Sequence, residues 1–242
     1  DLGCGPGATL AALGERYPRA QVIGADFSEP MLRASLAPRS RLRWLMPFLR
    51  GAKSALVAAD AAALPFAAGS QGLVWSNLLL HWLADPQPAL REMHRVLEVD
   101  GLLMFSTLGP DSLKELRACF PDGAARSLRF IDLHDYGDML VECGFADPVM
   151  DAERLTVIYP SFDALVDELR RSGASNGLFD RPRGLTGRGA WAAARANYEA
   201  LRQDGRLPVT LEVVYGHAWK VAPKKTADGA AIVRFDPKQR LR

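Results

Sequence analysis

The sequence DLGCGPGATL at residues 1–10 places three glycines directly after an aspartate. Gly3, Gly5 and Gly7 would let the backbone turn sharply and come close to a ligand, because a side chain there would occupy the space that the ligand needs. The turn therefore predicts a nucleotide-like ligand. The segment GCGPGA also satisfies the G-x-G-x-x-A pattern of dinucleotide-binding proteins, and this pattern alone does not separate the two kinds of ligand.

Short apolar runs alternate with helical patterns after this turn. Four buried strands are predicted, at residues 20–25, 55–59, 72–76 and 101–106. Each is apolar along most of its length, as expected when helices cover both faces of a parallel sheet. Two helices are predicted between them, one from the N-cap Ser28 to about Pro38 and one over residues 85–97. The alternation indicates an α/β fold with a Rossmann-like, doubly wound sheet.

The pattern changes after residue 107. Further helices are predicted at residues 111–119, 132–143, 161–172 and 189–203, and long strands at 147–159 and 208–221. We therefore expect one domain over residues 1–221, in which a helical insertion at 160–206 separates the two final strands. Residues 222–242 are expected to form a basic tail.

The composition excludes several classes of protein. The 242 residues carry a net charge of only +2, which is too little for a general nucleic-acid binder. No apolar run is long enough to span a bilayer. Three cysteines without C-x-x-C spacing, and four histidines without metal-ligand spacing, argue against a disulfide scaffold and a metal site. We expect a cytoplasmic protein, a monomer, with no metal, nucleic acid or membrane span.

Three aspartates narrow the choice of ligand. Asp1 precedes the glycine turn, where a carboxylate would attract a cationic group and repel a pyrophosphate. Asp26 closes the second strand and is placed to accept hydrogen bonds from ribose hydroxyls, although a dinucleotide fold would also have an acid there. Asp60 follows the third strand, where it could accept from an adenine amine. Together they favour a sulfonium with an amino acid and an adenosine group.

Four passages resemble the motifs of the class I S-adenosylmethionine-dependent methyltransferases: DLGCGPG, GADFSEPML, AADAAALPF and SNLLLHWLADPQPALREMHRVLEVDGLLMFST. The resemblance implies S-adenosylmethionine as cofactor and a sheet whose last strand is antiparallel. It also implies that the first strand begins before Asp1 and follows a helix, so we expect the sequence to be part of a longer chain.

The same resemblance implies a role for each matching residue. The methionine part would be bound by Asp1, Gly3, Gly5 and Gly7, and the ribose by Asp26. The adenine would lie between Phe27 and Met31. Its amine would donate to Asp60, beside Ala61, and Asn77 would also line the cofactor. For Phe27 and Met31, packing in the core is an equally good interpretation.

The second half of the chain carries a narrower resemblance. The passages DLHDYGDMLVECGFADPVMDAERLTVIYP, ELRRSGASNGLFDRPRGLTGR and LEVVYGHAWKVAP look like the malonyl-acyl-carrier-protein O-methyltransferases of biotin synthesis. Relatives of that family, including a mitochondrial complex I assembly factor, share these passages. The implied reaction is methylation of the free carboxylate of a malonyl thioester on acyl carrier protein. Modification of a respiratory subunit, another small acceptor and a non-enzymatic binding module remain as alternatives.

Arginines are concentrated in the predicted insertion. Six arginines and a single acid, Asp180, lie between Arg170 and Arg195. Guanidinium groups bind carboxylates with two parallel hydrogen bonds, so this segment is predicted to act as a lid over an acidic substrate. A solvated helix face is the alternative interpretation. The predicted substrate-binding residues are Arg181, Arg183 and Arg188.

The catalytic residues are not fixed by the sequence. A malonyl carboxylate is already ionised at neutral pH and needs no strong base, so catalysis would rest on orientation. His81 and Tyr136 are the candidates. His81 and Trp82 follow the fourth strand, where an acceptor pocket should open, and a packed aromatic pair fits that position equally well.

Overall fold

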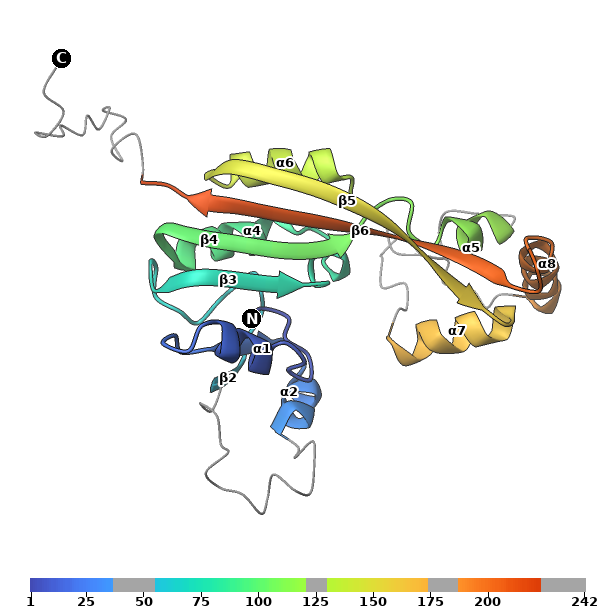
Figure 1. Cartoon of the computed structure of the whole chain (residues 1–242), viewed down its shortest axis with the longest axis horizontal. Coiled ribbons are helices and arrows are strands. Elements are labelled where there is room, and N and C mark those ends of the chain that lie inside the picture. Colours follow the sequence, from blue (N-terminus) through green and yellow to red (C-terminus); the bar gives the residue numbers. More distant parts are fainter. Residues whose placement is uncertain (37–54, 121–129, 174–186, 223–242) are drawn as a thin grey trace, which may run out of the picture.

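The computed structural model describes residues 1–36, 55–120, 130–173 and 187–222 (Figure 1). Its elements are, in chain order, α1 (Leu10–Arg16), β1 (Ile23–Asp26), α2 (Glu29–Leu36), β2 (Ala55–Ala58), β3 (Gln71–Asn77), the 3-10 helix η2 (Leu80–Trp82), α4 (Gln87–Val96), β4 (Leu97–Leu108), α5 (Lys114–Cys119), α6 (Leu133–Glu142), β5 (Phe145–Tyr159), α7 (Phe162–Arg171), α8 (Arg188–Glu199) and β6 (Leu207–Lys220).

The strands form a mixed sheet in two hydrogen-bonded groups. In the smaller group β1 and β2 pair in parallel. In the larger group the order is β3-β4-β6-β5, with β3 parallel to β4 and β6 antiparallel to both of its neighbours. The prediction of an α/β sheet with an antiparallel last strand is thus confirmed.

Residues 1–3 connect the two groups of strands. The Ala25 amide of β1 donates to the Asp1 carbonyl at 2.8 Å, and the Gly3 amide donates back to the Ala25 carbonyl at 2.8 Å. On the other side, the Leu2 amide donates to the Trp75 carbonyl of β3 at 2.7 Å. The order of strands therefore runs outward in both directions from residues 1–3. Open α/β sheets bind their ligands at such a reversal.

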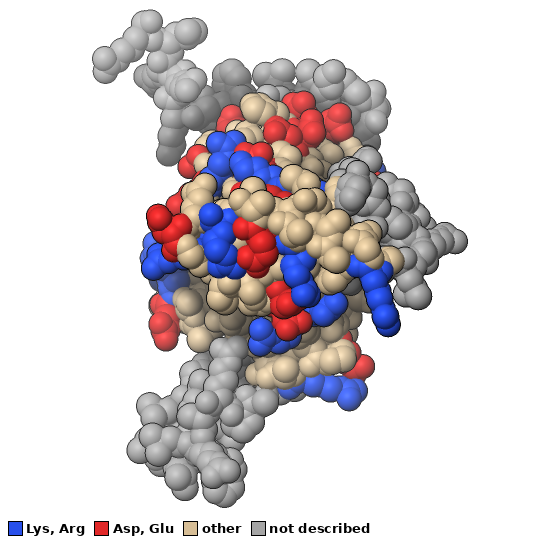
Figure 2. Space-filling view, turned by 90° about the vertical axis from the view of Figure 1, so that its right-hand side faces the viewer, with Lys and Arg blue, Asp and Glu red and all other residues tan. Residues whose placement is uncertain are grey.

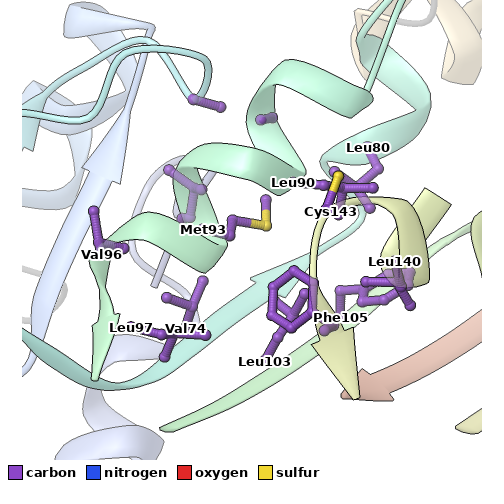
Figure 3. Packing of buried hydrophobic residues seen from close by; sticks show 14 of the residues in the cluster. Val74, Leu80, Leu90, Met93, Val96, Leu97, Leu103, Phe105, Leu140 and Cys143 are labelled. Atoms are coloured by element: carbon purple, nitrogen blue, oxygen red, sulfur yellow. The ribbon is translucent and has the colours of Figure 1, made fainter. Parts of the chain in front are cut away.

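Helix α4 shows how the main core forms. Its apolar residues recur at 89, 90, 93 and 96, which lie on one face of a helix, and all four are at most 1% exposed. Figure 3 shows Met93 directed toward Phe105 of the sheet and Leu90 beside Leu80 and Cys143, all within one buried cluster. Burying each large apolar side chain contributes about 1.5–3 kcal/mol. This layer holds β3 and β4 in place beneath the glycine turn.

A second hydrophobic cluster lies at the far end of β5 and β6, which extend beyond β4 (Figure 1). Helices α5, α7 and α8 surround this end of the two strands. Its largest fully buried side chains are Phe162, Leu165, Tyr198 and Leu207. Helices α7 and α8 lie between β5 and β6 in the chain. In Figure 1 this cluster stands at the same end of the sheet as the carboxyl ends of β3 and β4.

The edge of β6 beyond β4 is closed by the segment 109–115. The amides of Gly109 and Leu113 donate to the carbonyls of Glu212 and Thr210 at 2.9 and 2.7 Å. In return, the Thr210 amide donates to the Glu115 carboxylate at 2.9 Å and the Glu212 amide donates to the Ser112 hydroxyl at 3.0 Å. Four backbone groups that would lack partners are thereby satisfied. The segment fixes the second cluster to the end of β4.

Most predicted elements are found within a few residues of their expected bounds. The largest differences are that β4 begins at Leu97 rather than at residue 101, where Leu97 pairs with Gln71 and the register shifts before Leu73, and that α8 ends at Glu199 rather than at residue 203. Helix α1 was not predicted. Residues 37 and 38 of the predicted second helix, and nearly all of the predicted tail, lie outside the described residues. None of the helices in the described ranges has the length and apolarity that a membrane crossing requires.

Candidate functional site

The glycine turn has the backbone that its sequence predicts. Gly3, Gly5 and Gly7 have φ values of 72, 51 and 72°, in the left-handed region that favours glycine. A Cβ atom on Gly7 would lie 2.3 Å from the Ser35 hydroxyl, so this position needs glycine for packing. A Cβ atom on Gly5 would meet nothing within 4 Å. The open side of Gly5 is therefore where a ligand can approach the backbone closely.

Asp26 fastens the turn to the end of β1. Its Oδ2 atom accepts the Gly5 amide at 2.7 Å, and its Oδ1 atom accepts the Ser28 amide at 2.7 Å. A carboxylate offers about four acceptor positions, so both oxygens can still accept a ribose hydroxyl. Asp26 thus shapes the turn and stays able to bind the ligand.

Asp1 lies at the front of the same turn. Its Oδ2 atom accepts a hydrogen bond from the Thr9 hydroxyl, which comes from the residue before α1. This contact fixes the side chain beside the glycines. A carboxylate in that place provides negative charge for a cationic ligand group and disfavours a pyrophosphate.

The neighbouring strands bring two further polar residues to the same edge. Asp60 follows β2, is exposed, and accepts the Ala62 amide at 2.9 Å. Its neighbour Ala61 is buried at 7% exposure. Asn77 ends β3 and accepts a hydrogen bond from the Ser106 hydroxyl of β4. Asn77 therefore ends a strand that borders residues 1–3, while Asp60 follows β2, which pairs with β1 on the other side.

Phe27 and Met31 do not pack in the core. Phe27, which precedes α2, is 81% exposed, and Met31, in the first turn of α2, is 49% exposed. The interpretation of these two residues as core positions is therefore wrong. Two exposed apolar side chains next to Asp26 could cover the faces of an adenine ring, which is the role that the sequence predicted for them.

A row of rings follows the end of β3. His81 in η2 is 8% exposed, and its ring centroid lies 5.2 Å from that of Trp82 and 6.3 Å from that of Phe130. The Arg117 guanidinium lies 5.9 Å from the Phe130 ring centroid. The aromatic pair that the sequence allowed is present, while Phe130 and Arg117 were missed. They are separated from His81 by 36 or more positions, and no local pattern connects them.

Tyr136 is placed in the core. It is fully buried on α6, its hydroxyl lies 3.5 Å from the Thr107 hydroxyl, and burial raises its pKa. Tyr136, which follows His134 and Asp135, is one of the two catalytic candidates named from the sequence. In the structure its hydroxyl faces Thr107 inside the protein, so the observed contacts are those of a packing residue.

The predicted basic lid is only partly described. Arg181 and Arg183 lie outside the described residues, and Arg188 is exposed at the start of α8. Arg195 pairs with Asp163 at 2.5 Å and Arg170 pairs with Asp167 at 3.4 Å. Asp163 and Asp167 lie before Arg170, outside the segment whose six arginines predicted a basic lid. Accordingly, Figure 2 shows acidic and basic side chains interspersed at this end of the molecule.

The described part of the chain contains no group of three His, Cys, Asp or Glu side chains that could hold a metal ion. The cysteines Cys4, Cys119 and Cys143 are buried thiols.

The burial of His81 predicts a pH dependence of stability. Desolvation lowers its pKa from 6.5 to about 4, so the unfolded state binds a proton at a higher pH than the folded state does. The free energy of unfolding therefore decreases as the pH falls below 6.5, by roughly 2 to 3 kcal/mol at pH 4.5. Urea unfolding at pH 7.5 and 4.5 should show this loss for the wild type, and a smaller loss for His81→Asn. Equal losses in both proteins would contradict the assignment to His81.

Comparisons with known proteins agree with this geometry. Residues 1–105 match the family model described as a methyltransferase domain. The malonyl-[acyl-carrier protein] O-methyltransferase of Laribacter hongkongensis is 52% identical over 245 residues, which cover 98% of this chain and 81% of that protein. The protein of the same name from Gallionella capsiferriformans is 50% identical, covering 97% of this chain and 80% of the relative.

A solved structure supports the same fold. The YcgJ protein from Bacillus subtilis is 17% identical to this chain and has a TM-score of 0.59, covering 92% of this chain and 91% of its own. At that identity the likeness concerns the fold alone. The curated relatives are longer than this chain, which spans about four-fifths of their length.

Proposed function

The chain belongs to the family of malonyl-[acyl-carrier protein] O-methyltransferases, and we propose that it methylates the free carboxylate of a malonyl thioester on acyl carrier protein. The methyl donor is S-adenosylmethionine. The observation that carries the proposal is the 52% identity over nearly the whole chain, combined with a glycine turn that is open at Gly5 and is fastened to the Asp26 carboxylate. The glycine turn supports S-adenosylmethionine as the donor, and the similarity of the second half of the chain supports malonyl carrier protein as the acceptor.

We assign the donor site to the residues around the turn. S-adenosylmethionine would supply a methyl group bound to a sulfonium sulfur. The acceptor oxygen would form a bond to the methyl carbon, and the sulfur would leave with the electron pair of the broken bond. Asp1 would hold the cationic amino-acid end beside the glycines. Asp26 would accept from the ribose hydroxyls, and Asp60 would accept from the adenine amine. The open position at Gly5 leaves room for the backbone to touch the ligand.

The acceptor requires positioning rather than deprotonation. A malonyl carboxylate is ionised at neutral pH and is already a nucleophile, so no residue has to remove a proton. The protein must hold one carboxylate oxygen in line with the methyl carbon and the sulfur, and must exclude water. Orientation of this kind contributes up to about 7–11 kcal/mol. His81 and Tyr136 are therefore not needed as general bases.

We propose that residues 160–206 act as a substrate lid. Its helices α7 and α8 lie at the end of the sheet where β3 and β4 finish (Figure 1). Its candidate substrate contacts are Arg181, Arg183 and Arg188. Acyl carrier protein would approach this end as the partner.

Replacing Arg188 with alanine should impair acceptor use while leaving the donor site intact. Arg188 is exposed at the start of α8, and losing one charged contact at a partly solvated site should raise the KM for malonyl carrier protein about 3- to 10-fold. Steady-state kinetics and calorimetry with S-adenosylmethionine would measure the two effects. Arg170→Ala is the matched control, because Arg170 is already paired with Asp167. A fall in donor affinity with unchanged acceptor kinetics would contradict the lid.

We place this reaction in biotin synthesis in the cytoplasm, with the protein as a monomer. Methylation neutralises the carboxylate, so the acyl chain can enter an apolar synthase site where a charge would be costly to desolvate. The three buried thiols suit a reducing compartment. Transfer of a labelled methyl group to malonyl carrier protein, with acetyl carrier protein as the control without a free carboxylate, tests the acceptor assignment.

A further inference from the structure

Four buried side-chain atoms in the described structure make no hydrogen bond to a described residue: Trp75 Nε1, Ser76 Oγ, His81 Nδ1 and His94 Nε2. The Nδ1 atom of His81 is buried and makes no hydrogen bond to any residue that the structure describes. The ring as a whole is 8% exposed. An unsatisfied ring nitrogen inside a protein is unfavourable, and an apolar residue of similar size would serve packing better. A ligand atom that accepts a hydrogen bond from Nδ1 would remove this cost.

His81 is connected to the glycine turn through its own segment. Leu79 lies against Gly3, since a Cβ atom on Gly3 would stand 3.0 Å from the Leu79 Cβ. The Leu78 amide donates to the Ser106 carbonyl of β4 at 2.9 Å, which anchors the segment at the end of the sheet. His81 follows two residues after the contact with Gly3. The segment that carries His81 is thus in contact with the glycine turn through Leu79.

The surroundings of His81 suit an acyl chain with a polar end. Trp82, which is 42% exposed, and Phe130, which packs against the second hydrophobic cluster, both lie with their rings tilted against the imidazole. Arg117 lies over Phe130 and donates to the carbonyls of Pro110 and Ser112, which holds the start of the second cluster in place. Phe130 thus brings the second hydrophobic cluster close to the ring of His81.

The charge state of His81 also suits methyl transfer to a carboxylate. Because burial lowers its pKa to about 4, the ring is neutral at physiological pH. A carboxylate loses its negative charge as the ester forms, so a cationic partner would stabilise the starting carboxylate more than the transition state. A neutral N–H group can orient one oxygen while stabilising the starting carboxylate less than a cation would. It leaves the second oxygen free to attack.

We propose that His81 is a substrate-binding residue whose Nδ1–H group donates a hydrogen bond to one oxygen of the malonyl carboxylate, within the aromatic wall of Trp82 and Phe130. This inference rests on the proposed function and assigns the residue that orients its acceptor. In the step that follows, the other oxygen forms the bond to the methyl carbon. His81 keeps its proton throughout.

Two substitutions separate hydrogen bonding from packing. His81→Phe keeps a ring against Trp82 and Phe130 but has no donor, whereas His81→Asn keeps an N–H donor close to the position of Nδ1. In the full-length protein, the phenylalanine variant should lose about 10- to 100-fold in kcat/KM for malonyl carrier protein, as expected for a lost hydrogen bond to a charged group. The asparagine variant should stay within about threefold of the wild type. Calorimetry should show unchanged affinity for S-adenosylmethionine in both.

The outcomes distinguish this inference from the proposed function. A wild type that binds the donor but never methylates malonyl carrier protein overturns the proposed function. An active wild type overturns the inference if the phenylalanine variant keeps its kcat/KM, or if the asparagine variant loses as much as phenylalanine while still binding the donor. If the phenylalanine variant does not fold, His81→Leu takes its place under the same criteria.

A spectroscopic measurement tests the contact directly. With S-adenosylhomocysteine bound so that no reaction occurs, malonyl carrier protein should shift the imidazole ¹⁵N resonances of His81. Carrier protein without an acyl group should not shift them. Equal shifts with both carrier proteins would overturn a contact with the carboxylate.

Discussion

Replacing Asp26 with alanine is expected to weaken S-adenosylmethionine binding by about 100-fold, which corresponds to nearly 3 kcal/mol. The side chain has two functions at once. It accepts the amides of Gly5 and Ser28 at 2.7 Å each, and it is the proposed acceptor for the ribose hydroxyls. Its removal releases both loops that form the donor site and leaves the ribose without its partner. Calorimetry with S-adenosylmethionine and with S-adenosylhomocysteine would measure the loss.

Two controls belong to the Asp26 experiment. Asp26→Asn keeps one oxygen that can accept the Ser28 amide, so its affinity should lie between those of the wild type and the alanine variant. Asp151→Ala removes an exposed carboxylate on β5 whose oxygen accepts only the adjacent Ala152 amide, and it should change nothing. Tight binding of a nicotinamide dinucleotide by the wild type, without binding of the sulfonium, would contradict the donor assignment itself.

Replacing Gly5 with alanine is the second large effect that we expect. The added Cβ atom meets no protein atom within 4 Å, so it enters the space assigned to the ligand. Donor affinity should fall by about 10- to 100-fold, as expected for an extra carbon in a tightly packed contact. The backbone at φ 51° disfavours alanine by about 1–2 kcal/mol, which should appear as a lower free energy of unfolding.

Gly69→Ala separates these two effects. Gly69 also has a positive φ, 67°, and a Cβ atom there meets nothing within 4 Å, but it lies in the turn before β3. The alanine variant should lose similar stability and keep its donor affinity. If Gly5→Ala and Gly69→Ala have the same donor affinity, the open side of Gly5 is not the place where the ligand binds.

The fold could be predicted from local patterns because its elements follow them closely. The spacing of Ala89, Leu90, Met93 and Val96 defines one face of a helix, and that face is buried in the structure. The glycine turn could be predicted because few residues other than glycine adopt positive φ, and three occur within five positions. The start of β4 could not, because it depends on a register shift opposite Gln71 that no local pattern encodes.

The acceptor side depended on contacts between distant parts of the chain. Phe130 meets His81 only because the second hydrophobic cluster folds back toward η2. Counting arginines between Arg170 and Arg195 left out Asp163, which precedes that segment and neutralises Arg195 across two helices. Tyr136 lies beside polar residues in the sequence but belongs to the buried face of α6. Burial and ion pairs between elements are set by tertiary packing and are not visible in a local window.

The most direct test of the central claim is the intact mass of malonyl carrier protein after incubation with the full-length protein and S-adenosylmethionine. The account predicts a gain of one methyl group, its removal by an esterase, and no gain on acetyl carrier protein, because acetyl offers no free carboxylate. An unchanged mass of malonyl carrier protein, from a protein that binds the donor, would contradict the assigned acceptor. Methylation or hydroxylation of an arginine on a respiratory subunit by the same preparation would then favour the alternative reaction of the assembly-factor relatives.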